Sequence, residues 1–221
     1  MKAVSGIRIS RSITMRYVMF ILGLFVGAFG CVLTIKAHLG VAPWDTFHIG
    51  LQKTFGLTIG IWSQIVGVIV ILSSYVVAKI KPNFAMFLNM VCFGTFLDLI
   101  LWSNAIPEPQ TFVARLLVFL LGVIVMTIGI GMYLSPRLGA GPRDSFMLAM
   151  NERLGWSIQK VRLIIEITVL IAGAALGGPV SIGTVLIAVL TGPMIQRTIP
   201  FWEMVMKKQY GMPEPVKRQA S

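Results

Sequence analysis

Two aspartates occupy the same place in two copies of one short motif. Asp45 lies in the segment Leu-Gly-Val-Ala-Pro-Trp-Asp-Thr, and Asp144 lies in Leu-Gly-Ala-Gly-Pro-Arg-Asp-Ser. A carboxylate at this position can cap the helix that follows. A carboxylate that faces a cavity can instead hold a cation or a proton. The sequence alone leaves both interpretations open.

The residues beside the two aspartates differ between the copies. Trp44 in the first copy corresponds to Arg143 in the second. A tryptophan is typical of a membrane-interface anchor and an arginine of a cytosolic topology charge, whereas in a ligand site the two would make the site asymmetric. Asn89 is an uncharged polar residue within an apolar run, where it bonds to another helix or binds a ligand. The candidate substrate-binding residues are therefore Asp45, Asp144, Trp44, Arg143 and Asn89.

The glycines and prolines of the motif predict a helix end, a turn and a new helix. Gly40 and Gly139 can end the preceding helix in the left-handed conformation. Pro43 and Pro142 favour an extended backbone at the residue before them. The next helix, with the aspartate as its N-cap, is too short to cross a membrane, so it lies in the interface or re-enters the bilayer. If both copies re-enter, their positive N-termini meet and suit an anionic group, whereas the aspartates favour a cation or a proton.

The composition indicates a membrane protein. Hydrophobic residues make up 56% of the 221 residues and charged residues 12%, and the mean hydropathy is +0.84. A soluble domain has about half apolar and about a quarter charged residues. The net charge of +11 does not indicate a nucleic-acid partner, because the lysines and arginines lie between apolar runs. The lipid bilayer is the expected partner.

Six apolar runs are long enough to cross a bilayer, which takes about 20 residues. They extend from about 17 to 35, 57 to 78, 83 to 102, between 115 and 137, 158 to 176 and 181 to 199. With the N-terminus inside, 16 of the 19 lysines and arginines lie on the inner side. The positive-inside rule therefore predicts a multi-pass protein of the bacterial inner membrane with both termini cytosolic.

The motif is part of a longer repeat with an offset of 99 residues. Upstream of the motif, the matched residues are Arg16 and Arg115, Phe20 and Phe119, Gly23 and Gly122, and Gly30 and Gly129. The glycines, together with Gly27, permit close approach of the first and fourth spans. Each copy holds three spans, and this odd number gives the second copy the opposite orientation in the membrane.

The predicted fold is an all-α membrane protein with six transmembrane helices, two short interfacial or re-entrant helices and a 3+3 inverted-topology repeat. The predicted parts are a basic cytosolic N-terminus (1–15), a first three-helix repeat (16–104), an external loop (105–114), a second three-helix repeat (115–200) and a basic cytosolic tail (201–221).

Other polar residues of the apolar runs have simpler explanations. Glu166 lies four residues after Arg162, so the two can neutralise each other on one helix face. His38 and His48 flank the first motif and are candidates for carrying a proton. Cys31 and Cys92 lie in apolar runs without metal-ligand spacing, as packing residues do.

The leading function is transport or export of a small solute, because inverted repeats are typical of secondary transporters. A coupling ion would be a further ligand. The alternative is a non-transport membrane factor that regulates or assembles a partner complex. The chain has no phosphate-binding loop, H-E-x-x-H or G-x-S-x-G motif, so we expect no enzyme activity, no cofactor and no metal. Six short spans make a thin wall around a pathway, which favours a homodimer.

The segment GVAPWDTFHIGL, followed by GLTIGIWSQIVG, resembles the YczE/YyaS/YitT group of bacterial membrane proteins, and most closely its YczE-like branch. The segments RLGAGPRDSFMLAM and FLNMVCFGTFLDLIL fit the same pattern. The resemblance extends from about residue 16 to residue 200. It implies the fold, a bacterial origin and a cell-membrane location, and it carries no catalytic signature.

Overall fold

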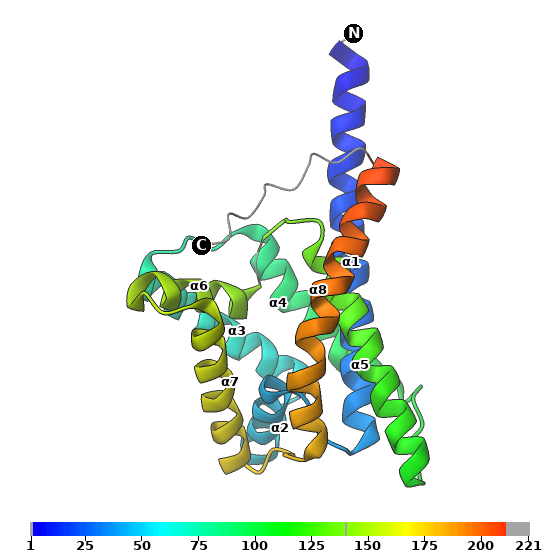
Figure 1. Ribbon diagram of the computed structural model, residues 1–221, viewed down its shortest axis with the longest axis vertical. Helices are drawn as coiled ribbons and strands as arrows, with labels where there is room; N and C mark the ends of the chain where they lie inside the picture. Colours follow the sequence, from blue (N-terminus) through cyan, green and yellow to red (C-terminus); the bar gives the residue numbers. More distant parts are fainter. Residues whose placement is uncertain (1, 140, 211–221) are drawn as a thin grey trace.

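A computed structural model shows that the chain is helical (Figure 1). The structure describes residues 2–139 and 141–210, apart from the side chains of residues 2–12, 144, 209 and 210. The predicted site residue Asp144 therefore has its side chain outside the described part. Within that part there are eight helices and no strand. The helices are α1 (Lys2–Ala37), α2 (Pro43–Phe55), α3 (Ile59–Ala78), α4 (Phe84–Ser103), α5 (Phe112–Leu134), α6 (Pro142–Leu154), α7 (Ile158–Ala175) and α8 (Ile182–Tyr210).

Five helices are long and apolar enough to cross a membrane. They are α1 from Ile13 onward, α3, α4, α5 and α8 up to Lys208. Large apolar side chains on these helices are exposed, as expected for surfaces that contact lipid. The chain is therefore a multi-pass membrane protein in contact with the bilayer. The fifth predicted span, α7, is not among the five, and it carries Lys160, Arg162 and Glu166.

The most extensive contact between the halves is that of α1 with α5, and it follows glycines of both helices. A side chain added at Gly23 would lie 2.9 Å from the carbonyl oxygen of Gly129. A side chain added at Gly30 would lie 2.8 Å from the carbonyl oxygen of Gly122, and one at Gly129 would lie 2.6 Å from the Cα atom of Gly27. The predicted close approach of these two helices at their glycines is confirmed, because the two backbones touch where side chains are absent.

The remaining contacts come in matched pairs. α1 packs against α4, and α5 packs against α8. The short helix α2 packs against α7 of the other half, and the short helix α6 packs against α3. The main departure from this pattern is that α3 packs along α4, whereas α7 makes no comparable contact with α8 in the described part.

Asp98 explains why α3 and α4 stay together. Its Oδ1 atom accepts a hydrogen bond from the backbone N–H of Gly60 at 2.8 Å, and its Oδ2 atom accepts one from the Thr58 hydroxyl. A side chain at Gly94 would lie 2.6 Å from the carbonyl oxygen of Gly60, so the helices touch. At the repeat offset, Arg197 stands where Asp98 would be, and α8 therefore lacks the carboxylate that would hold α7.

The last helix extends beyond the expected end of the last span near residue 199. α8 continues through Pro200, so residues 201–210 of the predicted basic tail are helical. Packing explains the continuation, since the side chain of Met206 is only 1% exposed. Glu203 also forms an ion pair with Arg137 at 2.6 Å, which holds this part of α8 to the segment after α5.

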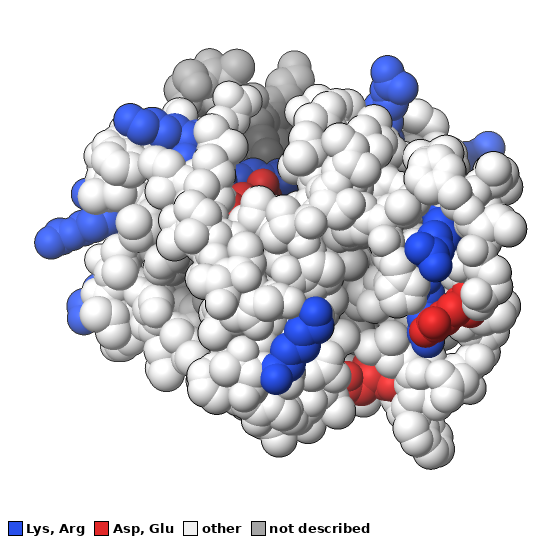
Figure 2. All heavy atoms as spheres, turned by 90° about the horizontal axis from the view of Figure 1, so that it is seen from below, with Lys and Arg blue, Asp and Glu red and all other residues white. Residues whose placement is uncertain are grey.

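Charged side chains at the opposite end of the bundle form a small surface cluster. Glu108 lies 3.1 Å from Lys36 and 3.7 Å from the Nε2 atom of His38. The hydrogen bond from Lys36 and the positive charge of its ammonium group hold the pKa of Glu108 below its usual range. His38 is thus part of a surface cluster. Seen from below (Figure 2), the charged residues are scattered between uncharged ones.

Candidate functional site

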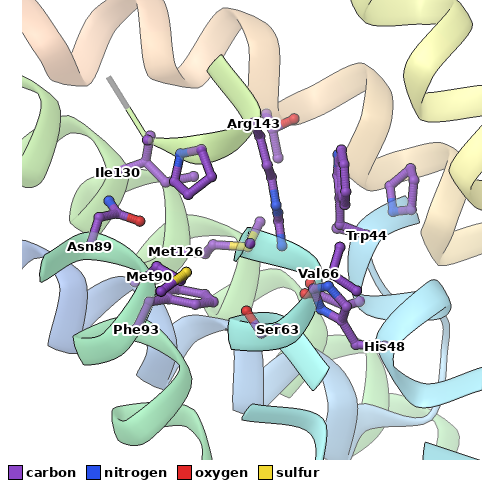
Figure 3. Close-up of a pocket in the computed structure, with 18 of the residues that line it drawn as sticks. Trp44, His48, Ser63, Val66, Asn89, Met90, Phe93, Met126, Ile130 and Arg143 are labelled. Carbon is purple, nitrogen blue, oxygen red and sulfur yellow. The ribbon is translucent and has the colours of Figure 1, made fainter. Parts of the chain in front are cut away.

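The short helices α2 and α6 begin next to each other. The guanidinium carbon of Arg143, the second residue of α6, lies 4.7 Å from the centre of the ring of Trp44, the second residue of α2. Figure 3 shows the two side chains side by side in a pocket. Equivalent positions of the two motif copies, 99 residues apart in the sequence, therefore meet in the folded chain.

A cavity of about 190 Å³ lies at this junction, and all eight helices contribute to its wall. Of the candidate residues, Trp44, Asp45, Asn89 and Arg143 line it. Apolar side chains from α4 and α5 complete one side, among them Phe93. The cavity combines charged, polar and apolar walls, as ligand sites do.

The motif prolines set the positions at which α2 and α6 begin. Pro43 and Pro142 are the first residues of these helices, where a missing N–H costs nothing. The residues before them, Ala42 and Gly141, have extended backbones with ψ of 154° and 170°, as predicted. The prediction that Asp45 caps its helix is wrong. Because the helix begins at the proline, Asp45 lies inside the first turn, and the N-cap residues form no side-chain hydrogen bond.

The motif glycines have a different role from the predicted one. The left-handed residues that follow α1 and α5 are His38 and Arg137, with φ of 55° and 52°. Gly40 has φ of 121°, and a side chain there would lie 2.6 Å from the backbone nitrogen of Thr184. A side chain at Gly139 would likewise meet the residue before α4. The glycines thus allow each motif to touch a helix start of the other half.

Asp45 is buried, with 4% of its surface exposed. Its Oδ2 atom accepts a hydrogen bond from the Cys31 thiol at 3.3 Å. Cys31, expected to be only a packing residue, therefore also holds the carboxylate toward α1. A buried carboxyl group needs such partners, because desolvation of a charge is costly.

Arg162 and Glu166 form the predicted ion pair on one face of α7. The Nε atom of Arg162 lies 2.8 Å from the Oε1 atom of Glu166. Both residues also line the cavity, which the sequence did not indicate. α7 carries three charged residues, Lys160, Arg162 and Glu166. It is therefore more polar than an ordinary lipid-facing span.

His48 is the site residue that sequence reasoning undervalued. Its side chain is 2% exposed and lines the cavity, and its Nε2 atom has no hydrogen-bond partner among the described residues. Buried polar atoms usually have a partner, so this nitrogen calls for an explanation. The signal was helical spacing: His48 follows Trp44 by four residues and Asp45 by three, which puts all three on one face.

These features define a polytopic membrane protein with an internal cavity at the junction of two repeated motifs. The chain belongs to a family of unknown function, DUF6198, which matches residues 14–200. An uncharacterized membrane protein of Bacillus subtilis, YczE, is 39% identical over 86% of this chain and 88% of its own length. This agrees with the resemblance to the YczE-like branch.

Two further relatives were found. The uncharacterized protein YyaS of Bacillus subtilis is 27% identical over 86% of this chain and 94% of its own length. An uncharacterized protein of Haemophilus influenzae is 30% identical over 74% of both chains. No solved structure matches the chain.

Proposed function

We propose that this protein transports or exports a small solute across the bacterial inner membrane, and that the cavity at the start of α2 and α6 binds the solute. The observation that carries this proposal is the meeting of Trp44 and Arg143 at one cavity. Secondary transporters commonly place their substrate between two inverted repeats, at the ends of short helices that do not cross the membrane.

The helix contacts support an inverted 3+3 repeat. Gly23 of the first half corresponds to Gly122 of the second, and Gly30 corresponds to Gly129. Exchanging the halves turns the contact of Gly23 with Gly129 into the contact of Gly122 with Gly30, and both occur. The contacts of α2 with α7 and of α6 with α3 exchange in the same way. A two-fold axis in the membrane plane would produce this pattern.

A sixth crossing by α7 completes the proposed topology. In Figure 1, α7 runs from α6 to the lower end of the bundle, where α8 begins. Its residues Arg162 and Glu166 line the cavity and neutralise each other, which lowers the cost of charge within the bilayer. With six spans, the excess of lysine and arginine on one side favours a topology with both termini in the cytosol.

The unequal packing of the two halves supports a route for the solute. α3 and α4 are closed against each other through Asp98, whereas α7 and α8 are not packed together in the described part. Glu166 of α7 and Ala188 of α8 both line the cavity. We therefore place the entrance between α7 and α8. If α7 closed against α8 while α3 separated from α4, the cavity would open to the opposite side of the membrane.

A tryptophan at Ala188 should prevent solute binding, because it would fill part of the cavity that Ala188 lines. The matched control is tryptophan at the next residue, Val189, whose side chain is 64% exposed and lies outside the cavity wall. The measurement is thermal stability of the purified proteins against a panel of organic acids, amines, amino acids and sugars. A solute at 100 times its Kd should raise the Tm of the wild type by about 5–10 °C.

The same solute should stabilise Val189→Trp, leave the Tm of Ala188→Trp unchanged, and accumulate in vesicles that contain the wild-type protein. If it binds in the cavity but does not cross the membrane, the non-transport membrane factor becomes the better explanation. If no solute stabilises the wild type, or if Ala188→Trp responds like the wild type, the cavity is not a solute site.

A further inference from the structure

We infer that the solute is a small organic monocarboxylate with an apolar body, and that Arg143 and the first turn of α2 hold its carboxylate. This inference rests on the proposed function, because it assigns the same cavity to a chemical class of ligand. Four observations support it: the arginine, the helix starts, the unpartnered histidine and the apolar wall.

Arg143 presents a cation to the cavity. One face of its guanidinium group lies against Trp44, which leaves the N–H groups at its edge available. None of the described carboxylates forms an ion pair with it. A planar guanidinium group with free edge donors matches the two oxygens of a carboxylate, which it can bind through two parallel hydrogen bonds.

The start of α2 adds further donors at the same place. The backbone N–H groups of Trp44 and Asp45 belong to the first turn, and they donate to no described acceptor. The N-cap residue Ala42 has no side chain that could bond to them. Such N–H groups and the positive end of the helix dipole favour an anion, and α6 begins at the same cavity.

His48 is an independent sign of a ligand site. Its Nε2 atom lies inside the protein without a described partner, one helical turn beyond Trp44 and on the cavity wall. Leaving such an atom without a hydrogen bond costs free energy. With its proton on Nε2, His48 would donate a hydrogen bond to a bound carboxylate, and the cost of burying the atom would be removed.

The other wall sets the shape of the ligand. Met90, Phe93, Met126 and Ile130 line it with apolar surface, as Figure 3 shows. A dry apolar cavity of about 150 Å³ takes up a benzene ring. The cavity here has about 190 Å³, enough for a ring or a branched aliphatic group with one carboxylate.

The acidic residues of the cavity limit the charge of the ligand. Glu166 is neutralised by Arg162 at 2.8 Å. Asp45 is turned toward Cys31 but remains on the cavity wall, so its carboxylate would repel a second negative charge. Arg143 is the cation without an ion-pair partner among the described residues, and Asp45 lies close enough to offset part of its charge. The cavity therefore accommodates a singly charged anion at Arg143, whereas a dianion such as phosphate would be repelled.

Benzoate, benzamide and benzamidine test the inference directly. They share one ring and differ in the charge of the attached group, which is negative, neutral and positive. We expect benzoate to stabilise the purified wild-type protein at a concentration at least tenfold lower than benzamide requires. Benzamidine should not stabilise it. Inorganic phosphate should have no effect.

Variants of Arg143 show whether the arginine is responsible. Arg143→Gln should weaken benzoate binding at least tenfold and leave benzamide binding within twofold. The benzoate affinity of Arg143→Lys should lie between those of Arg143→Gln and the wild type, because lysine keeps the charge but not the planar pair of donors. Arg153→Gln, at the exposed far end of the same helix, is the matched control and should bind benzoate within twofold of wild type.

Equal binding of benzoate and benzamide, tighter binding of benzamidine, or an Arg143→Gln variant that binds benzoate like the wild type would each overturn the inference. The inference is also wrong if none of the three compounds binds while an amine or a sugar of the panel binds and crosses the membrane. In that last case the proposed transport function stands. Failure of the whole panel would remove the transport function itself.

Discussion

Alanine in place of Gly129 should destabilise the protein strongly. The added methyl group would lie 2.6 Å from the Cα atom of Gly27 and 2.8 Å from the carbonyl oxygen of Gly23, and neither backbone atom can move without separating α1 from α5. Overpacking of this kind costs about 1–3 kcal/mol, so we expect the Tm in detergent to fall by about 5 °C or more.

Gly192→Ala is the control for this variant. Gly192 lies in α8, and a side chain there would meet nothing within 4 Å. Alanine is also the better helix former, so this variant should be as stable as the wild type or slightly more stable. If the two variants have the same Tm, the glycines of α1 and α5 are not in contact in the way described.

Alanine in place of Trp44 should weaken binding of an anionic solute about tenfold, because the ring against which Arg143 lies would be lost. A partly buried contact of a cation with an aromatic ring contributes about 1–2 kcal/mol, and about 1.4 kcal/mol corresponds to tenfold. Phenylalanine keeps an aromatic face, so Trp44→Phe should recover most of the affinity. The Kd of benzoate is the quantity to measure.

The chain offers a matched control for the loss of a tryptophan. Trp156 also lies under a cation, with the Lys160 nitrogen 4.5 Å from its ring centre, but neither residue lines the cavity. Trp156→Ala should therefore leave the benzoate Kd within twofold of the wild-type value. An equal loss of affinity in both variants would mean that Trp44 supports the fold and does not position Arg143.

The sequence alone predicts those features of this fold that depend on local pattern. Apolar length gives the positions of the long helices, and the recurrence of glycines at one offset predicts that α1 and α5 approach closely. The extended residue before each motif proline also follows from local sterics. The pairing of Arg162 with Glu166 needs only the helical spacing of four residues.

Features that depend on contacts between distant segments could not be predicted in this way. Pro200 reads as a helix end, but burial of Met206 keeps α8 helical beyond it. Asp45 reads as a helix cap, but the proline before it starts the helix two residues earlier, and the carboxylate turns to Cys31. Only the folded chain shows these partners.

For the candidate site, the motif indicated most of the residues but not that they contact each other. Trp44 and Arg143 could each be explained by membrane topology alone, and nothing in the sequence shows that they touch. His48 was harder to recognise, because its counterpart in the second motif is Met147 and the repeat therefore does not mark it. Its helical spacing from Trp44 becomes informative once the helix is known to begin at Pro43.

The two copies of the motif meet at one site inside the protein. The contact of Trp44 with Arg143 shows this meeting most directly, since the two residues belong to different copies. A double-mutant cycle with Trp44→Leu, Arg143→Met and the combined variant measures the free energy of that contact by equilibrium unfolding without solute. We expect a coupling free energy of about 1–2 kcal/mol. Effects that add to within about 0.5 kcal/mol would mean that the two residues do not interact, and would contradict the meeting of the motifs.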